Sequence, residues 1–236
     1  MKILYGILVL FISCSVWAAC PLGDSALKAK KYEQARSFLE GCALMDNDAL
    51  AHYKLAHLYA DGLLSAEQPQ LMTLRYLRFS AENGYAPAQY ELGRLMLEAL
   101  RTAEGKALLT SYTEQIRQLK EEKNLPLSQM SPMTWILLAA ERAENKWFYT
   151  APAIYVPEAE KYLQDAHLTQ QHLQEIRAQA IQWKQNKLMH TARQVMSDKE
   201  MQQFFPMPEN PTEAATLQNA FVALLKNKLK NYTLYN

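Results

Sequence analysis

The sequence predicts an all-α protein built from antiparallel helical hairpins that stack on one another, an α-solenoid. Apolar residues recur at helical spacing over most of the 236 residues, and only seven glycines are present. A motif also returns at a constant offset of 37, since Ala51, Tyr53, Leu55, Ala56 and Leu58 reappear as Ala88, Tyr90, Leu92, Gly93 and Leu95. A repeat of this period is typical of stacked hairpins, because each hairpin buries its apolar face only against its neighbours.

The second helix of each hairpin carries a motif of its own. An aromatic residue is followed four positions later by a small residue and then by alanine, as in Phe38/Cys42/Ala43, Tyr76/Ser80/Ala81 and Trp135/Ala139/Ala140. Small residues allow helices to approach closely, and the aromatic side chain fills the adjoining space. We therefore expect Tyr76 and Trp135 to be buried between hairpins. Gly62 and Gly84 follow the apolar stripes and indicate helix ends, where glycine readily takes the left-handed conformation.

These motifs resemble the Sel-one-like repeat (SLR) family, a relative of the tetratricopeptide repeats. The family pattern is matched at Tyr53, Leu55, Leu58, Tyr59, Gly62, Tyr76, Ala81, Gly84, Ala88, Gln89, Leu92 and Gly93. The chain departs from it at Ala56, which replaces a glycine, at Thr73, which replaces an alanine, and after Ala140, where no glycine follows. The resemblance covers about Lys28 to Trp183, with a gap in the middle. It implies a helical array with an adaptor or assembly role in envelope complexes, signalling or host interaction.

The first residues predict a secretory signal peptide over 1–18. Lys2 precedes an apolar run from Ile3 to Ile12, and small residues follow, so we expect cleavage after Ala18 and a periplasmic or secreted protein. A lipoprotein anchored at Cys20 is the less favoured alternative, because Trp17 stands where leucine is usual.

Two cysteines, Cys20 and Cys42, remain after such a cleavage. An even pair in an exported chain predicts a disulfide bond. A hairpin that turns near Lys31 brings the two positions together, and the bridge would stabilise the fold by roughly 3 kcal/mol in the chain-entropy model. The alternative is two free buried thiols.

The chain divides into four parts in this interpretation. They are the signal peptide 1–18, the SLR domain 19–187 with an insertion at about 98–131, a linker at 188–211, and an amphipathic C-terminal helix and tail at 212–236. The insertion either projects as a binding element or packs as an extra hairpin. The C-terminal helix is expected to dock on the last hairpin of the array, with a partner's groove or a membrane surface as alternatives. Its three lysines are too few for firm membrane anchoring.

The sequence contains none of the common short motifs of catalytic or nucleotide-binding sites. It contains no G-x-S-x-G, no P-loop and no H-E-x-x-H, so we expect no catalytic, cofactor or metal site. The 25 basic and 24 acidic residues nearly balance, which argues against nucleic-acid binding. The prediction is a non-catalytic periplasmic protein–protein interaction module with a protein partner. The alternatives are an accessory or inhibitor of a cell-wall or polysaccharide export enzyme, and a hydrolase whose residues meet only in three dimensions.

Overall fold

A computed structural model describes residues 19–45, 48–119, 130–141 and 156–235. The predicted signal peptide and its cleavage site lie outside these ranges. The described residues are mainly helical and contain no strand: α2 (Ala19–Lys28), α3 (Tyr32–Met45), α4 (Ala49–Ala60), α5 (Pro69–Glu82), α6 (Ala86–Ala99), α7 (Ala103–Leu119), α8 (Pro132–Ala140), α9 (Pro157–Asp165), α10 (Gln170–Val195), α11 (Asp198–Gln202) and α12 (Pro211–Tyr235). None of the described helices is both long and apolar enough to cross a membrane.

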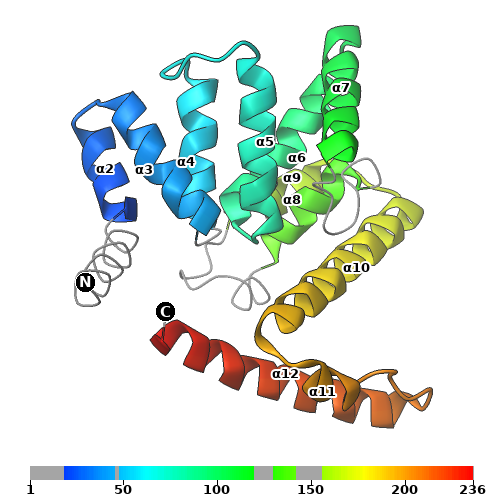
Figure 1. Ribbon diagram of the computed structural model, residues 1–236. Coiled ribbons are helices and arrows are strands. Elements are labelled where there is room, and N and C mark those ends of the chain that lie inside the picture. The colour runs from blue at the N-terminus through cyan, green and yellow to red at the C-terminus, as the bar shows by residue number, and fades with distance from the viewer. Residues whose placement is uncertain (1–18, 46–47, 120–129, 142–155, 236) are drawn as a thin grey trace, which may run out of the picture. The chain divides into compact units, whose positions relative to one another are not determined.

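The chain forms two compact units, which divide between Ala180 and Ile181. In the first unit, called the array below, α2 pairs with α3, α4 with α5, and α6 with α8. Each pair also packs on the next through α3–α4 and α5–α6 contacts, and Figure 1 shows these helices side by side in chain order. The predicted all-α architecture of stacked hairpins is confirmed.

Helix α7 interrupts the pairing of α6 with α8, where the sequence predicted an insertion. It packs beside α6 and touches α5. Tyr112 and Ile116 of α7 are almost fully buried, and the Arg78 guanidinium of α5 lies 5.9 Å from the centre of the Tyr112 ring. The described part of the insertion therefore contains a packed helix, and residues 120–129 lie outside the described ranges.

Helix ends in the array follow from local sequence. Gly62 and Gly84 follow the C-cap residues of α4 and α5 with φ values of 67° and 83°, a conformation that glycine adopts without strain. Asp48 caps the start of α4 by accepting a hydrogen bond from the Ala51 backbone N–H at 2.9 Å.

The core of the array contains the repeated positions. Leu55 and Leu92 are fully buried, and Trp135 is only 1% exposed. Gly93 lies where α6 meets α8, and a Cβ atom there would be 2.6 Å from the Pro132 carbonyl oxygen. Tyr76 differs from the expectation, because it is half-buried. Its ring stacks on Tyr59 and its hydroxyl donates to Glu40 at 3.2 Å, so its polar tip reaches the edge of the packed region.

The second unit has a small core of its own. Ala192, Met196, Phe204, Phe221 and Leu225 form it, with Leu188, Leu217 and Leu224 among the partly buried residues packed against it. The linker expected at 188–211 therefore differs from the structure: α10 continues to Val195, and Met196 and Phe204 enter the core. The linker was predicted because polar residues separate the apolar ones in this stretch, although the apolar residues keep helical spacing. The apolar face of α12 packs within this unit.

Candidate functional site

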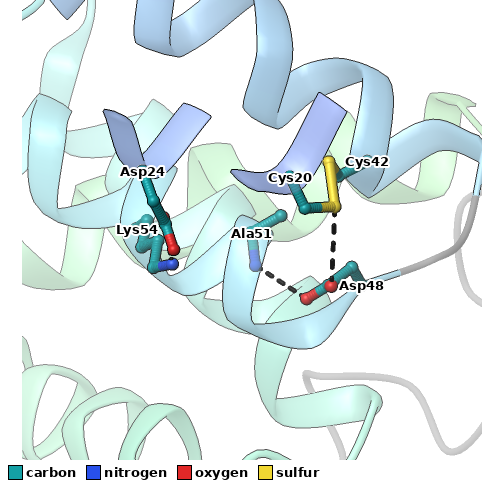
Figure 2. The surroundings of a disulfide bond; sticks show 6 residues. All are labelled: Cys20, Asp24, Cys42, Asp48, Ala51 and Lys54. Atoms are coloured by element: carbon teal, nitrogen blue, oxygen red, sulfur yellow. Dashed lines mark hydrogen bonds and ion pairs between the residues drawn. A yellow bond between two sulfur atoms is a disulfide. The ribbon is translucent and has the colours of Figure 1, made fainter. Parts of the chain in front are cut away.

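The disulfide predicted between Cys20 and Cys42 is present (Figure 2), with the two Cα atoms 5.7 Å apart. It joins α2 to α3, and Gly23 packs against Leu39 within the same hairpin. An ion pair between Asp24 and Lys54 ties α2 to α4 as well. Helix α2 is thus fixed on two sides.

Asp48 places the first turn of α4 beside the disulfide. One carboxylate oxygen caps the helix, and the other lies 3.9 Å from Cys20 Sγ (Figure 2). A disulfide sulfur carries no proton, so this second contact is van der Waals packing and not a hydrogen bond.

A cavity of about 430 Å³ opens at this place, and it is called the α2–α4 cavity below. Its apolar lining comes from Pro21, Leu39, Leu50, Ala51 and the Cys20 side of the disulfide, and its polar lining from Asp24, Ser25, Lys28, Asp48 and Lys54. Three helices supply the walls: α2, α3, and α4 with its N-cap.

A second cluster joins α4 to α6, and it is called the tyrosine–glutamate cluster below. The Tyr53 hydroxyl donates to the Glu91 carboxylate, and His57 Nε2 lies 3.1 Å from the other oxygen of that carboxylate. The Tyr53 ring meets His57 and Tyr85 edge to face, with centroids 4.5 and 5.0 Å apart. Burial and the nearby Glu91 carboxylate raise the pKa of Tyr53, so its hydroxyl remains a proton donor.

Two buried polar side chains connect successive hairpins in the same way. Gln89 of α6 donates to the Ala81 carbonyl at the end of α5, at 3.1 Å. His52 of α4 is hydrogen-bonded to the Ala43 backbone near the end of α3. The pKa of His52 is lowered to about 4, chiefly by burial and to a smaller extent by Arg75, although Asp48 and the Ala43 hydrogen bond oppose the shift. His52 is 5% exposed and packs against Phe79, with ring centroids 5.2 Å apart.

The other signature residues are buried or partly buried parts of helix contacts. Ala139 and Ala140 lie on α8 around Ile136, and Ala56 and Leu58 lie on α4. Among the residues that the structure describes, no three His, Cys, Asp or Glu side chains are grouped so as to hold a metal ion.

Sequence reasoning missed the tyrosine–glutamate cluster, because its residues form no known catalytic or binding motif. The available signal was the repeat period. Tyr53 and His57 are four residues apart on one helix, and Glu91 follows Tyr53 by about one repeat, which places it on the next equivalent helix.

Comparisons of the chain with protein families, with curated proteins and with solved structures found no match.

Proposed function

We propose that the array is an SLR-type protein-binding module without catalytic activity, and that it works in the periplasm or outside the cell. The observation that carries this proposal is the tyrosine–glutamate cluster. It presents half-exposed aromatic and charged groups that are held across two neighbouring helices.

Such a surface suits a protein partner for a physical reason. Tyrosine and arginine are enriched among the residues that dominate binding energy, because each combines a large apolar area with a polar end. Arg94 is an exposed cation on the same helix as Glu91, and its guanidinium lies 5.8 Å from the ring centre of Tyr90. Side chains already fixed by Glu91 lose little further conformational freedom when a partner binds.

The disulfide supports the proposed location. Bonds between cysteines persist in oxidising compartments and are rare in the cytosol. The Cys20–Cys42 bond fits export, and the SLR resemblance favours an adaptor or assembly factor of an envelope complex.

Crosslinking in intact cells tests the proposal. A photoreactive amino acid would replace Arg94 or, in a separate variant, His57, and Thr110, an exposed residue of α7, would be replaced as the control. We expect one and the same protein to be crosslinked from positions 94 and 57 but not from position 110, as identified by mass spectrometry. Equal labelling from all three positions, or no specific product, would contradict the proposal.

A quantitative test follows once that partner is purified. Arg94→Glu should weaken binding at least about tenfold, because it reverses an exposed charge at the expected contact. Lys106→Glu, an equivalent reversal on α7, should leave the affinity unchanged.

A further inference from the structure

We infer that the Asp48 carboxylate shields the Cys20–Cys42 bond from attack by thiolates, so that the bond is a lasting cross-link and not a readily exchanged one. Asp48 then has two roles, as the N-cap of α4 and as an electrostatic shield of the neighbouring sulfur. The inference concerns the chemistry of the disulfide and goes beyond the proposed protein-binding function.

A disulfide in a folded protein is opened by thiol–disulfide exchange. A thiolate attacks one sulfur and forms a new S–S bond with it, and the electron pair of the old bond leaves on the other sulfur as a thiolate. The attacking thiolate approaches in line with the bond, from the side that faces away from the leaving sulfur. Two attacks are therefore possible here, one on each cysteine.

Attack on Cys42 is prevented by burial. This residue is 0% exposed and belongs to an apolar cluster with Leu39, Ala43 and Leu55. A hydrated thiolate would have to lose its water to enter this cluster, which is energetically costly. Cys42 is therefore accessible only after the α2–α3 hairpin opens.

Attack on Cys20 is sterically possible but is opposed by charge. Cys20 is half-buried and lines the α2–α4 cavity. One Asp48 oxygen lies 3.9 Å from Cys20 Sγ, and Figure 2 shows it on the side of this sulfur that faces away from Cys42. A thiolate in line for attack would meet this negative charge. The sulfur that leaves would be Cys42, and a thiolate released in an apolar cluster is poorly solvated, which slows the exchange further.

Asp48 is held in the shielding position by the start of α4. Its other carboxylate oxygen accepts the Ala51 N–H at 2.9 Å, and the helix N-terminus favours a negative charge there. Other charges line the cavity as well: Asp24 and Lys54 are paired with each other, and Lys28 is exposed. Because the energy between charges falls with distance, the carboxylate in contact with the sulfur has the largest effect on attack there.

The rate of reduction of the folded protein tests the inference. The purified protein would be treated at one fixed pH with three small thiols: cysteamine, which carries a positive charge, neutral β-mercaptoethanol, and mercaptoethanesulfonate, which carries a negative charge. Samples would be alkylated at intervals, and peptide mapping would measure the remaining Cys20–Cys42 bond. Melting temperatures would verify that each variant is folded.

Asp48→Asn removes the charge and keeps the helix cap, because asparagine caps a helix about as well as aspartate. It should accelerate reduction by mercaptoethanesulfonate at least about fivefold, and reduction by cysteamine clearly less, because repulsion acts most on the anionic thiol. Asp61→Asn is the matched control, since it makes the same change at an exposed position at the other end of α4. It should leave all three rates unchanged.

Three results would overturn the inference. Unchanged rates for Asp48→Asn would show that the carboxylate does not impede attack. Equal acceleration by all three thiols would show that the substitution only loosens the hairpin, and equal acceleration by Asp61→Asn would show an effect of net charge alone. A reduction rate that is independent of thiol concentration would also contradict it, because opening of the hairpin would then limit the reaction.

Discussion

The α3–α4 and α5–α6 junctions both join one hairpin to the next, but they use different chemistry. At the first junction a histidine, His52, is bonded to the Ala43 backbone, and at the second an amide, Gln89, is bonded to the Ala81 carbonyl. The two positions are equivalent in the repeat, since 52 and 89 differ by 37. Both equivalent positions carry a buried side chain that can donate a hydrogen bond, and the residue type decides whether the junction responds to pH.

A second pair of equivalent positions shows the same principle. Cys42 and Ser80 occupy the small-residue position of the aromatic motif, and both are fully buried. Cys42 is bound covalently to α2, whereas the Ser80 hydroxyl donates to the Ala49 carbonyl at the start of α4, at 2.6 Å. Both side chains connect their helix to the preceding helix, Cys42 by a covalent bond and Ser80 by a much weaker hydrogen bond.

The largest expected effect concerns the aromatic position of the motif. Trp135→Ala should destabilise the array by roughly 3–5 kcal/mol, because it leaves a large cavity in the core around α8. Tyr76→Ala, at the equivalent but half-buried position, should cost roughly 2 kcal/mol. Urea unfolding followed by circular dichroism measures both, and equal losses would show that the two copies are packed alike.

The disulfide should contribute the next largest amount. Reduction should lower the free energy of unfolding of the array by about 3 kcal/mol, because the bond closes a loop with a sequence separation of 22. Urea unfolding with and without a thiol reductant measures the difference. Cys20→Ser serves as the control and should show no response to the reductant. If the reductant does not change the stability of the unaltered protein either, the disulfide does not restrict the unfolded chain as expected.

Much of the array could be predicted from the sequence, because the apolar residues recur with the period of the structural repeat. Gly62, Gly84 and the Leu55/Leu92 pair placed helix ends and core positions, and the cysteine count predicted the bridge. The core of the second unit was missed because its apolar residues, such as Met196 and Phe204, are separated by polar ones and by prolines. The candidate site was missed for a different reason. Tyr53 and Glu91 meet only through the spacing between helices, which a single helical pattern does not show.

A pH effect should distinguish the two junctions. His52 has a folded pKa of about 4, below its ordinary value of 6.5, so the unfolded chain binds more protons between these pH values. The contribution of neutral His52 to the free energy of unfolding is therefore fully present above about pH 6.5, and it decreases as the pH falls toward 4. Between pH 7 and pH 5 the loss attributable to His52 should be about 2 kcal/mol.

The second junction supplies the matched variants for this test. His52→Gln copies the residue of the α5–α6 junction and should remove this part of the acid sensitivity, because the amide can keep a hydrogen bond without titrating. Gln89→His should add a similar sensitivity. Urea unfolding at a series of pH values measures the slopes, and parallel slopes for the unaltered protein and His52→Gln would refute the assignment to His52.

The smallest expected effect concerns Ser80, whose position in the aromatic motif is equivalent to that of Cys42. Ser80→Ala should cost about 1 kcal/mol, because it removes one buried hydrogen bond from a carbonyl that also begins a helix. Thr216→Ala is the control: the Thr216 hydroxyl donates to the Thr212 carbonyl within α12, is exposed, and should contribute close to nothing. If both substitutions cost the same, burial of the Ser80 bond adds nothing to stability. The α2–α3 hairpin would then be the one with a strong tie, and the α4–α5 hairpin would depend on apolar packing.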